Sequence, residues 1–392
     1  MDPASKSYDV IVVGIGGMGS AVLYQLARRA RKVLGLERFD TPNEMGSSHG
    51  LTRIIRLAYY EHPSYVPLLR RAYELWRDLE RQAGEQLLYI TVSIDAGPPG
   101  SQVFEGSRKS CELHDLPHEV LTSRELTIRF PGYRLPSEML AVLQPEGGFL
   151  LPERCIVSHV MIAQAHGADV RGREQVLDWE PHGEKVVVRT DRNVYEAERL
   201  VITAGAWAYK LVDSLLGVAV PERQVMAWFE PYRPELFTPA RFPVFNLIVE
   251  EGRYYGFPAF QVPGFKLGRY HHLNETVDPD TMDRECYFRD EQVLRAFAER
   301  YFPEGTGRTM ALKTCMFTNT ADEHFILDLH PEYPQVSIAA GFSGHGFKFC
   351  SVIGEIMADL AEKGETRHEI EMFRLGRLTA QETGKDNSTQ IV

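Results

Sequence analysis

Three glycines near the amino terminus have the spacing of a phosphate-binding turn. Gly14, Gly16 and Gly19 match G-x-G-x-x-G. In this pattern the first glycine permits a tight turn, the second lets a pyrophosphate approach the backbone, and the third packs a helix on a strand. Glu37 follows Gly19 after eighteen residues, where a carboxylate can accept hydrogen bonds from ribose hydroxyls. These residues predict a dinucleotide-binding site.

A single cysteine later in the chain is a second candidate for chemistry. Cys315 lies in the strand-like segment ALKTCMFTNTADEHFILD. On the residues alone it could fill the core, as buried cysteines commonly do, act as a nucleophile, or tether a bound group. The five cysteines of the chain contain no C-x-x-C pair, which disfavours a disulfide framework or a structural zinc site.

The elements around the three glycines form a predicted βαβ unit. The apolar run YDVIVV reads as a strand, Met18, Val22 and Leu26 recur every four residues as in a helix, and a second strand ends at Glu37. Phosphates would meet the free amide groups and the positive dipole end of this helix. Both NAD and FAD fit such a unit.

The rest of the chain alternates between strand and helix patterns. KVVVRT and NVYEAERLVITAGAW predict a hairpin, and residues 225–272 predict a mostly antiparallel sheet. The stretch VSIAAGFSGHGFKFCSVIGEIMADLAEKG predicts a strand, a glycine loop and a closing helix. The predicted fold class is α/β plus α+β, with a Rossmann-type nucleotide domain and a second domain built on a mostly antiparallel sheet.

Length and composition limit the class of protein. A chain of 392 residues suggests about two domains. A net charge of −11 argues against general binding to nucleic acid or anionic lipid, so a local group of cations must hold any anionic substrate. No apolar run is long enough to span a bilayer. With no export or peroxisomal signal visible, we expect a cytoplasmic protein.

Several segments together resemble the monomeric sarcosine oxidase family of FAD-dependent amino-acid oxidases, which includes N-methyltryptophan oxidase and peroxisomal sarcosine oxidase. The segments are GSSHGLTRIIRLAYYEHPSYVPL, YYGFPAF, FKLGRYHH and CMFTNTADEHFILDLHP. The resemblance implies a monomer with an FAD-binding domain assembled from residues 1–85, 147–215 and 323–378. It implies a substrate domain from residues 86–146 and 216–322, and we expect a loose tail at 379–392.

The resemblance also implies how the cofactor is held. Cys315 would carry FAD through a thioether to the 8-methyl group of the flavin (8α-S-cysteinyl FAD), and Arg53 would lie over the flavin, where its charge favours the reduced form. Further residues are implied to contact FAD, in addition to the three glycines and Glu37: Ser47, Thr52, Val176, Gly344, Gly346 and Lys348.

The implied substrate site contains a carboxylate clamp and a shaped pocket. Arg56 and Lys348 match the clamp, in which a planar guanidinium and a compact ammonium hold the substrate carboxylate. Tyr255 matches a residue that shapes the pocket. His271 matches another, although the segment KLGRYHH is one residue longer than usual, so either His271 or His272 could point inward. The histidine pair has no carboxylate pattern beside it, and we expect no metal site.

Lys266 matches the family lysine that activates oxygen. A cation at this position stabilises the developing negative charge of superoxide. Phe317 is also implied to contact the substrate. Some positions depart from the family pattern: Phe317 replaces a tyrosine, Leu51 an aspartate and Ser48 a histidine. These departures leave the preferred substrate open, and a larger or more apolar N-alkyl amino acid than sarcosine is plausible.

The implied reaction is oxidation of the C–N bond of sarcosine or a related secondary amino acid. The product imine hydrolyses, giving formaldehyde and a primary amino acid from an N-methyl substrate, while O2 is reduced to hydrogen peroxide. A cyclic or bulkier substrate of the pipecolate or N-methyltryptophan type is the alternative. The rival classes are an NAD-dependent dehydrogenase, a flavin dehydrogenase that passes electrons to a partner protein, and a non-catalytic dinucleotide-binding regulator.

Overall fold

The structure is a computed structural model that describes residues 6–379. The chain divides into two compact units, each built from separated segments. Of the described residues, 6–49, 153–221 and 316–379 form the first unit, and 50–152 and 222–315 form the second.

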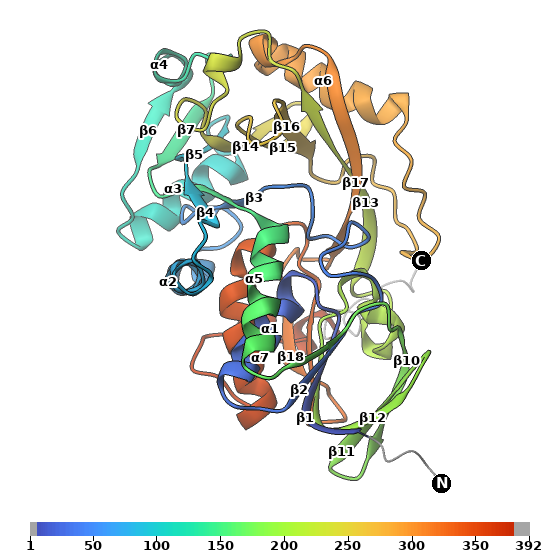
Figure 1. The fold of residues 1–392 in the computed structure, drawn as a ribbon. Helices are drawn as coiled ribbons and strands as arrows, with labels where there is room; N and C mark the ends of the chain where they lie inside the picture. Colours follow the sequence, from blue (N-terminus) through green and yellow to red (C-terminus); the bar gives the residue numbers. More distant parts are fainter. Residues whose placement is uncertain (1–5, 380–392) are drawn as a thin grey trace, which may run out of the picture. The chain divides into compact units, whose positions relative to one another are not determined.

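The first unit contains an eight-stranded sheet and the helices that pack on it (Figure 1). Its strands are β1 (Lys6–Val13), β2 (Val33–Leu36), β9 (Asp169–Arg171), β10 (Val176–His182), β11 (Lys185–Thr190), β12 (Val194–Ile202), β18 (Ile326–Leu329) and β19 (Val336–Ala340). Its helices and 3-10 turns are α1 (Gly17–Arg28), α5 (Pro152–Ala165), η2 (Gly205–Lys210), η3 (Asp213–Leu215), η6 (Phe347–Phe349), α7 (Cys350–Lys363), η7 (Glu371–Phe373) and α8 (Gly376–Thr379).

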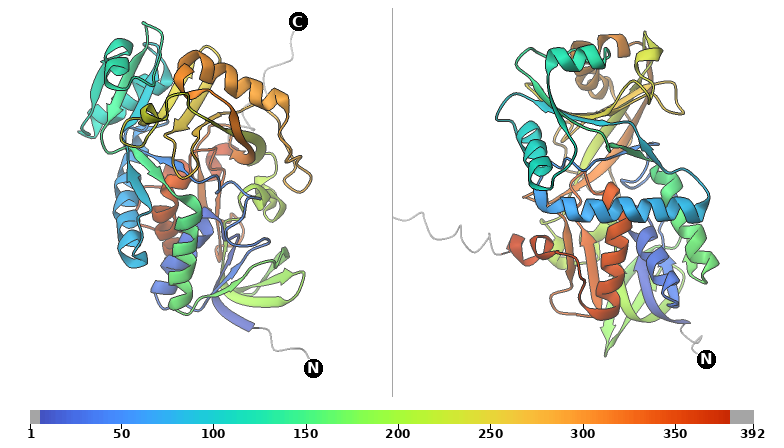
Figure 2. Two further views of the ribbon diagram at one scale, coloured as in Figure 1. Left: turned by 45° about the horizontal axis from the view of Figure 1, so that its top comes forward. Right: turned by 90° about the vertical axis from the view of Figure 1, so that its left-hand side faces the viewer.

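Five strands of this sheet run parallel, in the order β9, β2, β1, β12 and β19. Strands β2 and β19 are short runs without charged residues, and every residue of both is buried, as expected where both faces of a parallel sheet are covered. Helices α1 and α7 pack against each other and on these strands, and they lie side by side in both views of Figure 2. Parallel strands end at one edge of the sheet, so the turns after β1, β12 and β19 leave from that same edge.

The second unit contains an eight-stranded sheet in the order β17-β13-β16-β15-β14-β5-β7-β6 and a three-stranded sheet in the order β3-β8-β4. Its strands are β3 (Arg53–Ile55), β4 (Leu88–Ile90), β5 (Ser93–Gly97), β6 (Glu119–Thr122), β7 (Leu140–Gln144), β8 (Gly148–Leu150), β13 (Val220–Phe229), β14 (Val244–Val249), β15 (Gly252–Phe257), β16 (Phe265–Arg269) and β17 (Thr309–Asn319). Its helices and 3-10 turns are η1 (Pro63–Tyr65), α2 (Val66–Ala83), α3 (Gln102–Leu113), α4 (Ser123–Arg129), η4 (Pro234–Leu236), α6 (Phe288–Tyr301) and η5 (Pro303–Gly305).

Aromatic side chains fill the core of the second unit. The rings of Tyr254 and Phe297 stack with centroids 3.7 Å apart, which ties β15 to α6. Phe245 stacks on Phe302 at 4.8 Å, and both belong to one cluster of buried residues that also includes Phe265. Such rings bury a large apolar area each, and this core holds strands β14, β15 and β16 in place beneath the candidate site residues of the unit.

The predicted architecture is confirmed. The βαβ unit of β1, α1 and β2 forms as expected, β11 and β12 pair as a hairpin, and strands β13 to β16 pair antiparallel where their register is described. Arg56 directly follows the short strand β3, which pairs with β8, a strand far along the chain.

The compact units and the predicted domains differ mainly at residues 50–85. The sequence assigns this segment to the FAD-binding domain, whereas it clusters with the second unit, where β3 and β4 both pair with β8. Most of the predicted loose tail, from residue 380 on, lies outside the described residues.

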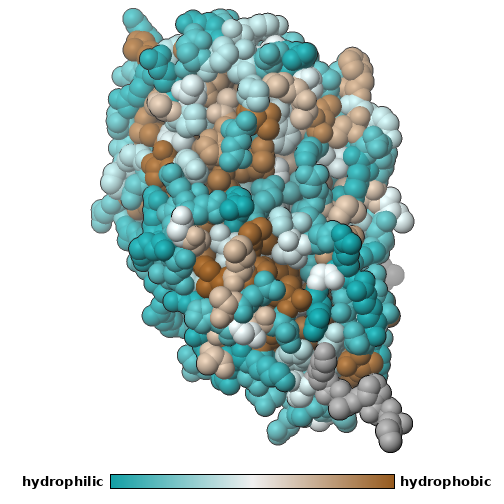
Figure 3. Space-filling view, viewed as in Figure 1, coloured by the Kyte–Doolittle hydropathy of each residue, from teal (hydrophilic) through white to brown (hydrophobic). Residues whose placement is uncertain are grey.

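The molecular surface is predominantly hydrophilic on the face shown in Figure 3, with hydrophobic residues in small separate groups. In the part of the chain that the structure describes, no helix combines the length and the apolar character needed to cross a membrane.

His159, a buried histidine between α1 and α5, is expected to make the free energy of unfolding depend on pH. His159 is 2% exposed, its Nδ1 lies 3.3 Å from the Ser20 hydroxyl, and burial lowers its pKa to about 3. Between pH 6.5 and about 3 the unfolded chain therefore binds one more proton at this residue, so the free energy of unfolding falls as pH falls, by at most about 1.4 kcal/mol per pH unit.

We expect His159→Gln to reduce the loss of thermal stability between pH 7 and pH 5, measured by scanning calorimetry. The exposed His182, replaced by glutamine, is the matched control and should leave the pH dependence unchanged. Equal pH dependence in wild type and His159→Gln would show that other groups cause it.

Candidate active site

Of the three glycines in the turn of the first unit, only Gly16 has open space where a side chain would point. Gly14 has φ +87°, and a Cβ there would lie 2.7 Å from the Thr203 carbonyl oxygen. A Cβ on Gly19 would lie 1.8 Å from the Gly14 carbonyl oxygen, whereas a Cβ on Gly16 would meet nothing within 4 Å. The first and third glycines are thus required by packing, and the open space at Gly16 is where a ligand can approach the backbone.

The amino terminus of α1 is suited to an anion. Gly16 caps this helix without a side-chain hydrogen bond, and the first turn contains no acidic residue. The Gly17 amide donates to the Ser48 hydroxyl at 3.3 Å. The amide groups of the first turn and the helix dipole favour phosphate at this position.

Glu37 is held by backbone donors at the end of β2. Its two carboxylate oxygens accept hydrogen bonds from the amides of Ile15 at 2.8 Å and Phe39 at 2.9 Å. Burial raises the pKa of Glu37, and the backbone hydrogen bonds oppose this shift. Each carboxylate oxygen can accept more than one hydrogen bond, so Glu37 can still receive ribose hydroxyls. The glycine turn, the helix end and this carboxylate together fit the nucleotide portion of FAD.

The glycine loop near the carboxyl terminus contains or precedes two predicted site residues, Gly344 and Lys348. Gly344 has φ +77°, and a Cβ there would lie 2.4 Å from the Phe317 ring. No other residue type therefore fits under Phe317. Lys348 lies in η6, one turn before α7, and its buried ammonium donates to the His345 carbonyl oxygen at 2.6 Å.

Lys266 is a buried cation in the second unit. It lies on β16, is 2% exposed, and donates to the Gly50 and Thr52 carbonyl oxygens at 2.6 and 2.9 Å and to the Thr52 hydroxyl at 3.1 Å. Its ammonium also lies 4.4 Å from the centre of the Phe257 ring. These oxygen acceptors are neutral, so they orient the ammonium without cancelling its charge.

Arg53, Cys315 and Tyr255 lie close together in the same unit. The Arg53 Nη2 is 3.8 Å from the Cys315 Sγ, and Cys315 is buried against Met226 and Trp228. Burial raises the pKa of Tyr255, with a smaller opposing effect from Arg53, so its phenol remains a hydrogen-bond donor at neutral pH. The ring of Tyr255 occupies the space above Gly268, where a Cβ would lie 2.4 Å from the phenol oxygen.

Arg56 is buried with two carboxylates. Its Nη2 donates to both oxygens of Glu61, at 3.1 and 2.9 Å, and its Nε lies 3.6 Å from Asp95. Its guanidinium also lies over the rings of Tyr59 and Tyr60. Burial opposes the charge, but Asp95 and Glu61 raise the pKa of Arg56 well above its usual value. This position therefore holds a permanent cation that already binds a carboxylate.

The two adjacent histidines differ in environment. His272 is fully buried, and its Nε2 lies 3.0 Å from Asp290, a carboxylate that also binds Arg223 through two hydrogen bonds of 2.9 Å. His271 has φ +55°, and its side chain is 33% exposed, with Nδ1 3.1 Å from Glu222. Of the pair, His272 is thus buried in an ion network, and His271 is the one with solvent access.

Comparison with known proteins identifies the family. Residues 9–360 match the family described as FAD dependent oxidoreductase. A monomeric sarcosine oxidase from Bacillus sp. (strain NS-129) is 43% identical over 95% of this chain and 97% of its own length. The chain belongs to the monomeric sarcosine oxidase family of FAD dependent oxidoreductases. It is an FAD-dependent amine oxidoreductase, as its sequence predicted.

Other members of this family are also similar over nearly their full length. N-methyl-L-tryptophan oxidase from Yersinia pestis (strain Pestoides F) is 33% identical over 94% of this chain and 99% of its own. Among solved structures, NikD, an amino acid oxidase essential for nikkomycin biosynthesis, has a TM-score of 0.82 at 26% identity, covering 94% of this chain and 98% of its own.

Two further residues predicted to contact FAD, Ser47 and Val176, lie in the first unit. Ser47 is exposed after the βαβ unit, and Val176 begins β10. The sequence missed Glu61 and Asp95, the carboxylates on Arg56; only the short spacing between Arg56 and Glu61 could have indicated a pair. It also missed Thr203, whose hydroxyl donates to the Val13 and Gly14 carbonyl oxygens.

Proposed function

We propose that this enzyme oxidises the C–N bond of sarcosine or another N-alkyl amino acid. The observation that carries the proposal is Arg56, a guanidinium that is 1% exposed and binds the carboxylate of Glu61. A water-excluded guanidinium is suited to hold the carboxylate of an amino acid. The names of the relatives, sarcosine oxidase and N-methyl-L-tryptophan oxidase, support the substrate class.

The size of the N-alkyl group is the open feature of the substrate. Phe317 presents a ring without the hydroxyl of a tyrosine, and Leu51, with φ +71°, occupies a left-handed position. Both changes make the surroundings more apolar. They favour a larger or more apolar substrate than sarcosine, so a cyclic or aromatic secondary amino acid is the alternative.

FAD, when bound, supplies the chemistry by accepting two electrons and a proton equivalent from the amino acid and passing the electrons to O2. Arg56 and Lys348 bind the substrate carboxylate, and Tyr255 and His271 shape the pocket around it. The amine must be neutral to react, because its lone pair drives the oxidation, so the rate rises with pH. Lys266 places a buried positive charge where reduced oxygen species develop.

Cys315 is proposed to carry the cofactor covalently. A thioether keeps the flavin from dissociating and holds it in register with the substrate. The Arg53 guanidinium, 3.8 Å from the Cys315 sulfur, is positioned to stabilise negative charge there. Ser47, Thr52, Val176, Gly344 and Gly346 are proposed as further contacts to FAD. We also propose that the enzyme is a cytoplasmic monomer; the printed name of the Bacillus relative supports the monomer.

Because Glu61 already binds Arg56, we expect the Glu61 carboxylate to compete with the substrate carboxylate for this guanidinium. A substrate carboxylate has to displace Glu61, whose side chain is 4% exposed. In Glu61→Gln the competing group is neutral, and we expect the KM for the amino acid to fall about five- to tenfold, since a hydrogen bond between charged groups exceeds a neutral one by about 1 kcal/mol.

The measurement is steady-state kinetics together with acetate titration followed in the flavin spectrum, because acetate tests the carboxylate alone. Glu74→Gln on the exposed part of α2 is the control and should change neither value. An unchanged or higher KM in Glu61→Gln would exclude competition by Glu61.

The proposed reaction is tested by incubating the purified enzyme in air with sarcosine, N-methyltryptophan, pipecolate and glycine. The proposal predicts equal amounts of peroxide and oxidised substrate, and formaldehyde from the N-methyl compounds only. Turnover with an artificial electron acceptor but little peroxide would favour a flavin dehydrogenase. Turnover that requires NAD would favour a nicotinamide enzyme, and no turnover with any of them would favour a regulator.

A further inference from the structure

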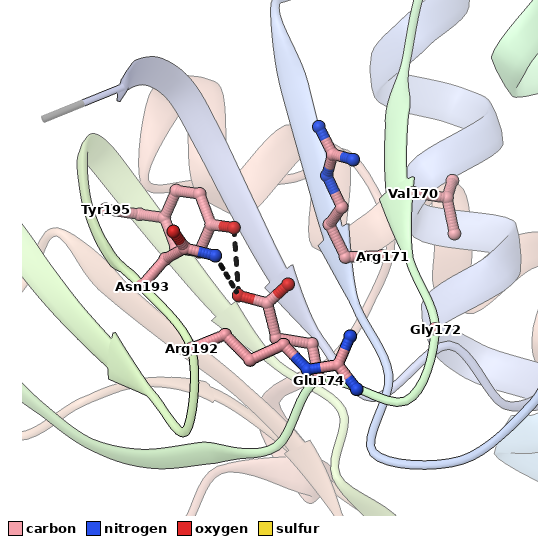
Figure 4. Close-up of a pocket in the computed structure, with 7 residues that line it drawn as sticks. All are labelled: Val170, Arg171, Gly172, Glu174, Arg192, Asn193 and Tyr195. Atoms are coloured by element: carbon pink, nitrogen blue, oxygen red, sulfur yellow. Dashed lines mark hydrogen bonds between the residues drawn. The ribbon is translucent and has the colours of Figure 1, made fainter.

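A polar pocket lies in the first unit, and none of the residues that line it is assigned to FAD or substrate, although the backbones of Arg171 and Glu174 hydrogen-bond to the backbone of Glu37. It has a volume of about 390 Å³, within the range of small-molecule sites. It is formed by the end of β9 and the turn after it, by the turn between β11 and β12, and by the start of β12 (Figure 4). The charged and polar side chains that line it are those of Arg171, Glu174, Arg192, Asn193 and Tyr195.

Glu174 is a buried acid with one oxygen turned to the pocket. It is 3% exposed, and its Oε1 accepts hydrogen bonds from Thr190 at 2.7 Å, Tyr195 at 2.9 Å and Asn193 at 3.3 Å. Figure 4 shows the other oxygen pointing away from Tyr195 and Asn193, toward the side where Arg171 lies. Three donors thus fix the carboxylate through one oxygen and leave the other for a ligand.

Arg171 and Arg192 add two exposed guanidinium groups. Neither makes a hydrogen bond or ion pair through its side chain with any residue from 6 to 379. The neighbouring cations are all paired: Arg173 with Asp40, Arg189 with Asp178, and Lys185 with Glu196. In a chain with a net charge of −11, two cations left without a carboxylate at one pocket are unusual, and they supply donors for anionic groups.

We propose that this pocket binds a small molecule with two carboxylates and one ammonium group, the chemical class of the acidic amino acids. The two guanidiniums bind the two carboxylates, and the second oxygen of Glu174 accepts from the ammonium. The pocket then carries one positive charge in excess and the ligand one negative charge. A ligand with anionic groups alone would meet the Glu174 carboxylate unpaired, which costs binding free energy.

The test is isothermal titration calorimetry on the holoenzyme with L-glutamate, with glutarate, which lacks the ammonium group, and with inorganic phosphate. We expect one glutamate per chain, bound at least about tenfold more tightly than glutarate or phosphate, because one charge-assisted hydrogen bond is worth about a factor of ten. Glutarate or phosphate binding as tightly as glutamate would overturn the proposed ligand class.

Variants locate the binding. Arg171→Gln and Arg192→Gln change exposed side chains and should each weaken glutamate binding at least about tenfold. Glu174→Gln keeps the acceptor for the three donors but places an amide where the ammonium binds, so it should abolish the preference for glutamate over glutarate. The matched control is Arg173→Gln, whose side chain pairs with Asp40 outside the pocket, and it should bind as wild type.

Two results would overturn the site itself. One is that glutamate shows no saturable binding at concentrations up to about 10 mM, which is about ten times a Kd of 1 mM. The other is binding that is unchanged in Arg171→Gln and Arg192→Gln, which would place glutamate elsewhere, for example on the carboxylate clamp. Binding at the clamp would also change the visible spectrum of the flavin, whereas the proposed pocket contains none of the residues assigned to FAD.

Discussion

Replacing Lys266 by methionine is expected to slow reoxidation of the reduced enzyme by O2 at least about a hundredfold and to leave its reduction by the amino acid within about threefold of wild type. The Lys266 ammonium is 2% exposed and donates to three neutral oxygens. A charge oriented in this way stabilises the first reduced form of oxygen, whose negative charge develops only in the oxidative half-reaction. Methionine has a similar length and removes the charge.

The two half-reactions are measured separately by stopped-flow absorbance, first without oxygen and then by mixing the reduced enzyme with O2. Lys109→Met, at an exposed position of α3, is the control and should alter neither. Lys266 also ties β16 to the Gly50–Thr52 turn, so a purely structural role would slow both half-reactions alike. Equal slowing would therefore contradict the assignment to oxygen.

Replacing Cys315 by alanine is expected to convert a covalently bound flavin into one that is released on denaturation. In wild type, acid precipitation should leave the yellow colour in the protein pellet, and in Cys315→Ala all of it should appear in the supernatant. The reason is that the Cys315 thiol is 3% exposed and has the Arg53 guanidinium 3.8 Å away. The measurement is the visible spectrum of the two fractions.

Cys286→Ala is the matched control, because Cys286 is a half-buried cysteine of the same unit. It should retain the flavin in the pellet. Release of flavin from wild type would mean that Cys315 is core filling and that FAD is bound non-covalently. Retention in Cys315→Ala would point to another attachment residue.

Much of the nucleotide half of this protein could be predicted from short stretches of sequence. Gly14 has a positive φ and Gly19 packs on the Gly14 carbonyl oxygen, and both reasons act within a few residues. The period of Met18, Val22 and Leu26 reports the helix directly. The strand that contains Lys266 belongs to residues 225–272, which the sequence predicts to form a mostly antiparallel sheet. The resemblance to a known family then assigned roles that spacing alone left open, above all for Cys315.

The partners of the charged residues could not be predicted in this way. Lys266 reaches the Gly50 carbonyl oxygen across 216 residues of chain, and Arg56 meets Asp95 only because β5 lies against the segment that follows β3. Which of His271 and His272 is buried depended on Asp290, at the start of α6.

The sequence by itself predicted the family and the cofactor class, because several of its segments resemble those of a known family, and it named candidate site residues whose roles stay predictions. Only the tertiary structure decided that Arg56 is already occupied by Glu61, that the Lys266 charge rests on neutral oxygens, and that Glu174 shares a pocket with two arginines. Ion pairing and burial depend on distances between segments that meet only in the folded chain. No local pattern records those distances.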